Sequence, residues 1–254
     1  MKKIITIGIT LLLFLPVFAQ KDSIKPADKV LIVPYQEMMF FSDADQDMAR
    51  FSRSNERNVR TDIRNNLEVN VYHQLLVICD AISLMRSTTY NSDEDLKRIY
   101  ASTRYAVYSR AVREEFFEKQ KREKKSPVKS LMGKFKKKSK DQAFWVNDSN
   151  TMLAVIDNPE IFQHLTSKYH EQYILFITQF EINTSNKNSI EWTVQKYTRE
   201  YILHYNLFDK SGNLIRAETL TLKGGNENTM KEVNDKYLIL IAQRLREILA
   251  AVRY

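Results

Sequence analysis

The chain has 254 residues, with 39 Lys and Arg against 31 Asp and Glu, a net charge of +8, one Cys and five Gly. Its length allows one large domain or two small ones, and 43% hydrophobic with 11% aromatic residues exclude a disordered chain. A single Cys excludes a disulfide framework and Cys-rich zinc modules, and neither GxGxxG nor GxxxxGK[ST] occurs. Composition alone names no reaction.

Residues 1–20 have the pattern of a secretory signal peptide. Two lysines precede an apolar run over Ile4–Phe14, and Pro16 breaks the run before a cleavage site expected after Ala19 or Gln20. The run is shorter than the ~20 residues of a membrane-spanning helix, and the single cysteine lies too far away to carry a lipid anchor. We therefore expect a periplasmic protein without a transmembrane span, free or peripherally associated with the outer membrane.

The pattern after the signal peptide predicts a strand and then a long helix. Val30–Tyr35 is a continuous apolar run that is typical of a buried strand, and Pro34 should mark its end. Residues 36–58 are mostly polar and predict a loop with a short helix. Between Val59 and Met85, apolar residues recur three or four apart, which predicts about seven turns of helix.

A second helix is expected after the capping residues at 91–93, continuing as a charged rod until Ser126 and Pro127 stop it. The rod leads into Lys119–Lys140, which contains eleven Lys and Arg and one acidic residue, a net charge of +10. Loss of residues 1–20 would lower the net charge of the chain to +6. Since Lys119–Lys140 alone carries +10, the rest of the shortened chain carries about −4. The sequence thus predicts a mildly acidic domain with a basic insertion at about 110–145.

The second half of the chain predicts strands framed by helices. Its elements are a short apolar run over Met152–Ile156, a helix from Asn158 to Tyr169, strands over Tyr173–Ile182, Trp192–Phe208 and Leu214–Leu222, and a helix over Met230–Val252. A turn at 209–212 joins the last two strands into a hairpin. We expect residues 21–254 to form a single α+β domain, an antiparallel-meander sheet with amphipathic helices packed on it plus a helical charged insertion.

Three pieces of this pattern resemble a known kind of domain. They are the VLIVPY strand before a long helix, the helix HLTSKYHEQ leading into YILFITQF, and the hairpin YILHYNLFDKSGNLIRAETLTL before a C-terminal helix. Together they resemble the periplasmic α/β domain of the curli-secretion lipoproteins, the penicillin-binding-protein-activator lipoproteins and the N-terminal domain of the Tol-system β-propeller protein. The resemblance covers residues 30–85 and 158–252. The lipid-attachment Cys is absent, and Thr178 and Gln179 replace glycines common in such strands.

What the resemblance implies is non-enzymatic binding of a protein partner at the cell envelope, often within a secretion or cell-wall complex. It supplies no catalytic residues, and a shared fold does not establish a function.

No catalytic or metal-binding motif emerges from the acidic residues. Asp43, Asp45 and Asp47 resemble the start of a calcium loop, but Met48 and Ser54 stand where such a loop needs Gly and Glu. An acidic loop or a helix N-terminus is the better interpretation of these three aspartates. We therefore predict no metal site and no cofactor.

The histidines and the cysteine also lack a recognisable motif. His73, His164, His170 and His204 form neither HxxxH nor HExxH, and Cys79 beside Asp80 is expected to be a buried small hydrophobe. Neither GxSxG nor SxxK occurs, so the common serine-nucleophile patterns are missing as well. We predict no catalytic residue.

The basic segment is the candidate binding site, for lipid headgroups, cell-wall carboxylates or an acidic partner. Lysines near an anionic membrane contribute ~1 kcal/mol each, and apolar residues between them can insert at the interface. The candidate residues are Lys121, Arg122, Lys124, Lys125, Lys129, Lys134, Lys136, Lys137, Lys138 and Lys140. Export would take the segment away from nucleic acid. A solvated flexible loop without a binding role is the alternative interpretation.

The preferred hypothesis is a non-enzymatic periplasmic accessory module that docks on a cell-envelope or secretion complex. Two alternatives stay open: an envelope hydrolase whose site is assembled from residues distant in sequence, and a structural subunit that is stable only in a complex. A deep pocket with convergent Asp, Glu, His or Ser side chains would favour the hydrolase.

Overall fold

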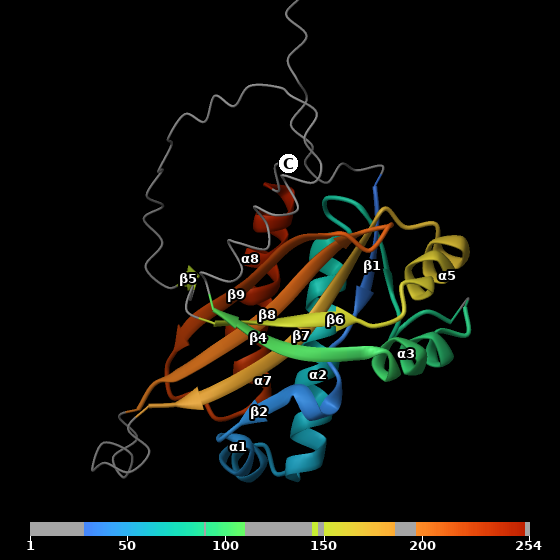
Figure 1. Cartoon of the computed structure of the whole chain (residues 1–254). Helices are drawn as coiled ribbons and strands as arrows, with labels where there is room; N and C mark the ends of the chain where they lie inside the picture. Colours follow the sequence, from blue (N-terminus) through green and yellow to red (C-terminus); the bar gives the residue numbers. More distant parts are fainter. Residues whose placement is uncertain (1–27, 89, 110–143, 147–149, 186–196, 252–254) are drawn as a thin grey trace, which may run out of the picture.

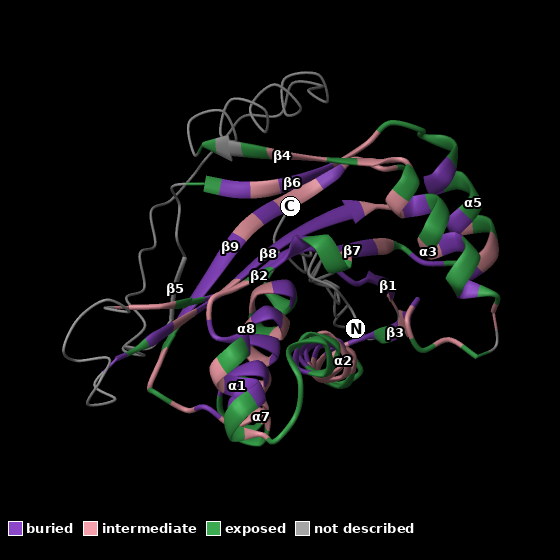
Figure 2. Ribbon diagram, turned by 90° about the horizontal axis from the view of Figure 1, so that it is seen from below, coloured by how far each residue is buried: buried purple, intermediate pink, exposed green. Residues whose placement is uncertain are grey.

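The computed structural model describes residues 28–88, 90–109, 144–146, 150–185 and 197–251, which build three layers around a central sheet (Figures 1 and 2). The sheet is mixed, with the strand order β3-β1-β7-β8-β9-β5, and β2 also pairs with β7. Its strands are β1 (Lys29–Val33), β2 (Phe40–Ser42), β3 (Asp80–Ser83), β5 (Phe144–Val146), β7 (Tyr173–Thr184), β8 (Arg199–Asp209) and β9 (Leu214–Gly224). The predicted α+β class is confirmed.

The expected meander is present as β7, β8 and β9, which pair antiparallel in chain order. The turn between β8 and β9 forms because the Asp209 carboxylate accepts hydrogen bonds of 2.9 Å from the backbone N–H groups of Ser211 and Asn213. Gly212 completes the turn at a φ of 81°, which suits glycine best. Strand β1 pairs in parallel with β3 and β7, and β2 pairs in parallel with β7. The predicted meander included none of β1, β2 and β3.

One long strand, β7, has two parallel neighbours on the same side. Its first part pairs with β1, where Val33 stands opposite Phe176, and its second part pairs with β2, where Phe40 stands opposite Phe180. Pro34 lies just beyond the end of β1, as predicted, and the chain makes the short 3-10 helix η1 (Glu37–Met39) before it rejoins β7. This detour projects from the sheet between β1 and β2.

The first face of the sheet is covered by α1 (Asp45–Phe51), α2 (Glu56–Leu75), α7 (Met230–Val233), a π-helical turn (Asn234–Leu238) and α8 (Ile239–Ala250) (Figure 2). The Asn55 side chain caps α2 by accepting a 2.8 Å hydrogen bond from the Asn58 N–H. Thr229 and Glu232 form a capping box at the start of α7. The apolar side of α2 is buried, as the spacing of Val59 and Ile63 predicted.

The second face carries α3 (Ser92–Ala101), α5 (Glu160–Tyr169) and a two-stranded sheet of β4 (Thr103–Ser109) and β6 (Asn150–Ile156) (Figure 2). Strand β1 is buried from both sides, since Val30 and Ile32 pack toward the first face and Leu31 and Val33 toward the second. A continuous apolar run is what such a doubly covered strand requires.

Side chains of the main sheet bind the backbone of β6. Thr178 and Asn206 donate to the Met152 carbonyl over 3.0 and 3.1 Å, and His204 Nδ1 accepts from the Met152 N–H over 3.2 Å. These polar side chains can be buried because they hydrogen-bond backbone groups along an edge of β6 that would otherwise have no partner.

Two predicted helices are shorter in the structure. The helix expected over 59–85 ends at Leu75, and residues 80–83 instead form β3, which pairs with β1. The second helix ends at Ala101, and Thr103 begins β4, which pairs antiparallel with β6. In both segments, pairing with a strand distant in sequence overrides a helical spacing.

Several predictions concern residues that the structure does not describe. The signal peptide, the charged rod from 110 onward, most of the basic insertion and the start of the Trp192–Phe208 strand lie outside the described residues. Within the described part of the chain, no helix combines the length and apolar character needed to cross a membrane.

Candidate binding groove

Three arginines share one side of α2, next to its buried apolar side. Arg57, Arg60 and Arg64 are three and four residues apart, a spacing that stacks side chains along one helix face. They line an open pocket of about 340 Å³, together with residues from the β1–β2 detour. The other residues lining this pocket are Tyr35, Glu37, Met38, Phe40, Thr61 and Asn65.

Arg60 is fixed by a buried carboxylate. Its Nε lies 2.5 Å from Oδ2 of Asp45, whose side chain is only 6% exposed. The guanidinium also lies 5.2 Å from the centre of the Phe40 ring, within the range of a cation–π contact. About half of the Arg60 side chain stays exposed, so this anchored cation still faces solvent.

Arg64 is fixed by backbone and phenol oxygens. Its Nε donates to the Tyr35 carbonyl over 3.0 Å, and its Nη2 donates to the Tyr100 hydroxyl over 3.1 Å. The Tyr100 hydroxyl in turn donates to the Pro34 carbonyl over 2.8 Å. Burial raises the pKa of Tyr100 to about 12, although the Arg64 charge opposes the shift, so this phenol stays neutral. Glu37 is the remaining partner, with Oε1 at 3.7 Å from Nη1.

Arg57 differs from the other two arginines. It is exposed near the start of α2, and its side chain has no hydrogen-bond or ion-pair partner among the described residues. It therefore adds an uncompensated positive charge to the pocket.

A second open pocket of about 550 Å³ adjoins the first, and the two share Glu37, Met38 and Arg64. Helix α3 forms its far wall with Asp93, Leu96, Lys97 and Tyr100. We call the two pockets together the arginine groove. Its cations are Arg57, Arg60, Arg64 and Lys97.

The groove also has an apolar rim. Met38 in the detour lines both pockets and is 69% exposed. An exposed large apolar side chain beside clustered cations is more informative than either feature alone, because interaction sites combine both.

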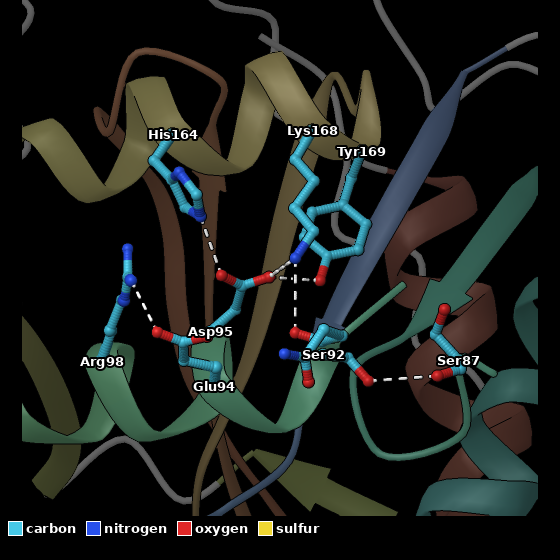
Figure 3. Close-up of polar contacts among 9 residues, drawn as sticks. Ser87, Ser92, Glu94, Asp95, Arg98, His164, Lys168 and Tyr169 are labelled. Atoms are coloured by element: carbon cyan, nitrogen blue, oxygen red, sulfur yellow. Dashed lines mark hydrogen bonds and ion pairs between the residues drawn. The ribbon is translucent and has the colours of Figure 1, made fainter. Parts of the chain in front are cut away.

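A buried aspartate holds the α3 wall in place (Figure 3). Asp95 in α3 is 3% exposed and accepts hydrogen bonds from three side chains of α5. Its Oδ1 lies 2.8 Å from His164 Nε2, and its Oδ2 lies 2.5 Å from Lys168 Nζ and 2.6 Å from the Tyr169 hydroxyl. Figure 3 shows these side chains descending from α5 toward Asp95.

Both oxygens of the Asp95 carboxylate are already hydrogen-bonded. Burial alone would raise the pKa of the Asp95 carboxyl, but hydrogen bonds from Lys168, Tyr169 and His164 outweigh it and hold the pKa below its usual range. Burial and the Asp95 charge raise the pKa of Tyr169 well above that of a free phenol. This cluster therefore joins α3 to α5 and leaves neither Asp95 oxygen without a donor.

The three aspartates whose spacing resembles the start of a calcium loop have different partners. Asp43 accepts from the Thr184 hydroxyl over 2.7 Å, Asp45 pairs with Arg60, and Asp47 lies 3.5 Å from the buried Arg199. Among the residues that the structure describes, no group of three or more His, Cys, Asp or Glu is placed to hold a metal ion.

The four histidines and the cysteine also lie in separate parts of the fold. His164 binds Asp95, whereas His204 Nε2 lies 3.2 Å from Glu181 of the neighbouring strand in the central sheet. His73 is exposed on α2, and His170 ends α5 in a left-handed conformation. Cys79 is buried, and burial raises its pKa to about 12.

The ten basic residues proposed from sequence, from Lys121 to Lys140, lie outside the described residues, so their role stays a prediction. The arginine groove was not predicted. The spacing of Arg57, Arg60 and Arg64, three and four residues apart, was the available signal, but nothing in the neighbouring sequence shows which groups face them.

Comparisons with known proteins identify no relative by sequence: no family model matches the chain, and no curated protein does. Solved structures with a similar course of the chain include a PelC dodecamer from Paraburkholderia phytofirmans, 7% identical over 89% of this chain and 92% of that chain, with a TM-score of 0.36. The hypothetical protein CT253 from Chlamydia trachomatis is 13% identical over 89% of this chain and 94% of that chain, with a TM-score of 0.37. Likeness at this level carries no information about activity or partners.

Proposed function

We propose that the protein is a non-enzymatic binding module of the cell envelope that docks on an envelope or secretion complex through the arginine groove. The observation that carries this proposal is the row of Arg57, Arg60 and Arg64 in an open pocket beside the exposed Met38. Envelope location rests on the signal-peptide pattern of residues 1–20.

The state of the polar groups around the groove supports binding over catalysis. Asp45 is committed to Arg60, and both oxygens of Asp95 are committed to α5. Tyr100 donates to a backbone carbonyl, and its pKa of about 12 makes it a poor proton-transfer group at neutral pH. What the groove offers a partner is an excess of positive charge, four cations against Glu37 and Asp93, together with apolar surface.

A cross-linking pull-down from native envelopes tests this role, with the full chain as bait and mass spectrometry as the readout. The test variant combines Arg57→Glu with Lys97→Glu, two exposed groove cations, so the fold should be kept. The matched control is Lys231→Glu, an exposed cation in α7 that lies outside the groove. Circular dichroism melting shows whether each variant is folded.

We expect the groove variant to lose partners that the wild type and the Lys231 variant both retain. Recovery of the same partners by all three proteins would overturn the assignment of the groove. Hydrolysis of envelope components by the purified wild type would favour the envelope hydrolase instead. Failure of the purified chain to melt in one cooperative transition would favour the structural subunit.

The basic segment is proposed as a second contact, with lipid headgroups, cell-wall carboxylates or an acidic subunit. Deleting residues 121–140 should lower binding to anionic vesicles or to cell-wall sacculi, and added salt should lower wild-type binding in the same way. Unchanged binding after the deletion would contradict this contact without affecting the groove.

A further inference from the structure

We propose that the arginine groove recognises an acidic peptide segment of a partner protein, and that Glu37 occupies the position of one of its carboxylates in the free protein. This inference rests on the binding role proposed above. It adds the chemical class of the ligand and a residue of this chain that competes with it.

The shape of the cation row favours a peptide. Arg57 and Arg64 are separated by two turns of α2, about 10 Å along the helix axis. A single compact anion cannot reach both ends of such a row, whereas carboxylates spaced along one chain can. Lys97 lies across the groove on α3, but Asp93 lines the same wall, so the excess of positive charge is on the α2 side.

Arg64 is already oriented for a carboxylate. Two of its nitrogens are held by Tyr35 and Tyr100, so little side-chain freedom remains to be lost on binding. The third nitrogen, Nη1, is the one that lies 3.7 Å from Glu37 Oε1. A guanidinium nitrogen fixed in this way recognises carboxylate with defined geometry.

Glu37 and Asp45 are the two acids paired with groove arginines, and they differ in how firmly they are held. Asp45 is 6% exposed and lies 2.5 Å from Arg60, so it forms part of the framework. The Glu37 side chain is 87% exposed and stands farther from its arginine. An exposed pair of this kind adds little stability, so an incoming carboxylate can replace Glu37 at small cost.

The apolar residues of the groove indicate the rest of the ligand. Met38, next to Glu37, is largely exposed, and Leu96 faces the same pocket from α3. Met is unbranched and adapts to varied partner side chains. A segment that combines acidic residues with an aliphatic one therefore fits the groove better than a phosphate ion does.

Fluorescence anisotropy with the full chain tests the proposal. The probe is a fluorescein-labelled 12-residue peptide with a Glu-Glu-Leu repeat, and the control peptide has the repeat Gln-Gln-Leu. The proteins are the wild type, Glu37→Gln, Arg57→Gln and the control Lys231→Gln. We expect salt-sensitive binding of the acidic peptide, about three-fold tighter for E37Q and about three-fold weaker for R57Q, as for gain or loss of one exposed charge contact.

Three results would overturn the inference: equal affinity for both peptides, no binding of the acidic peptide at millimolar concentration, or E37Q binding no tighter than the wild type. Saturable binding of inorganic phosphate or of phosphatidylglycerol vesicles that R57Q abolishes, without peptide binding, would also overturn it. If the peptide fails while the groove variant still loses its envelope partners, the binding role stands and only the ligand class fails. If the peptide binds as expected but the groove variant keeps every partner, the envelope role of the groove fails instead.

Discussion

The side-chain oxygen of Asn206 in β8 accepts a 2.7 Å hydrogen bond from the backbone N–H of Ala154 in β6. Asn206 is fully buried, and its amide nitrogen donates to the Met152 carbonyl as well. One side chain of the central sheet thus satisfies two backbone groups of the strand that crosses it. This explains a polar residue in the middle of a buried strand.

Replacing Asn206 with Leu should therefore destabilise the protein. The change leaves the buried Ala154 N–H without its partner, while the Met152 carbonyl keeps the hydrogen bond from Thr178, and we expect a loss of about 2 kcal/mol in the free energy of unfolding. Urea denaturation measures it. Asn183→Leu is the control, because Asn183 is exposed on β7 and donates to the Glu181 side chain. Similar losses in both variants would contradict the role of Asn206.

Asp95→Asn should loosen α3 in a pH-dependent manner. Because three hydrogen bonds hold the pKa of Asp95 below its usual range despite burial, its stabilising contribution is present above the unfolded pKa near 4 and is lost as the pH falls. We expect a deficit of about 3 kcal/mol at neutral pH that shrinks in acid. Urea titrations from pH 3 to 7 measure it, with exposed Asp93→Asn as the control. A deficit that does not change with pH would contradict this account.

Glu171→Gln should have the opposite effect on stability and stabilise the protein at neutral pH. Glu171 is 1% exposed, and its Oε2 has no hydrogen-bond partner within the described residues. Burial raises the pKa of Glu171 above its usual range, so the folded state loses stability as the pH rises through the unfolded and then the folded pKa. Removing the charge should stabilise the protein by about 1 kcal/mol at neutral pH.

Thermal melts at several pH values measure the gain, which should vanish in acid, where the wild-type carboxyl is protonated as well. Glu160→Gln, at the exposed start of α5, should show no such gain. A Glu171 variant that is less stable than the wild type at neutral pH would refute the prediction.

Gly212→Ala should destabilise the hairpin between β8 and β9. The residue has a φ of 81°, and an added Cβ would lie 2.6 Å from a carbon of the Phe162 ring in α5. Both backbone strain and overpacking follow, and we expect a loss of about 2 kcal/mol. Gly225→Ala is the comparison, since its Cβ would meet the end of the Glu227 side chain. Equal effects of the two changes on the melting temperature would argue against this mechanism.

Cys79 should react with a thiol reagent only when the protein opens. Its burial, together with the Asp80 charge, raises the pKa to about 12, so little thiolate exists at neutral pH. Its Sγ also lies 3.4 Å from the Leu75 carbonyl at the end of α2. Maleimide labelling at pH 7 should be slow in buffer and rapid in urea. Equal rates in the two conditions would show that this part of the structure is open.

Local pattern predicted the elements whose burial is simple. The apolar run of β1, the turn at 209–212 and the apolar side of α2 all follow from residue type and spacing. The end of α2 does not, because Ile78 and Ile82 continue the helical spacing beyond Leu75. What decides this segment is the pairing of β3 with β1, a contact far along the chain.

The groove, too, can be predicted only in part from the sequence. The arginines of α2 share a face for reasons that spacing alone explains, but Tyr35, Glu37 and Tyr100 reach them from two other elements. Only the tertiary structure brings those groups together. Asp95 is a similar case, because a charged residue in the first turn of a helix is ordinarily exposed, and here α5 covers it.

The interrupted pairing along β7 has a consequence for how this surface can vary. Since β1 and β2 are each registered on β7 by their own backbone ladders, residues 34–39 are under no pairing constraint of the sheet. Because Tyr35 and Met39 are buried in the core, only changes at the exposed Glu37 and Met38 would reshape this wall while both ladders and the buried layers stay as they are. The exposed tip of the detour can thus diverge in sequence without a cost to the sheet, whereas the buried residues on either side of it cannot.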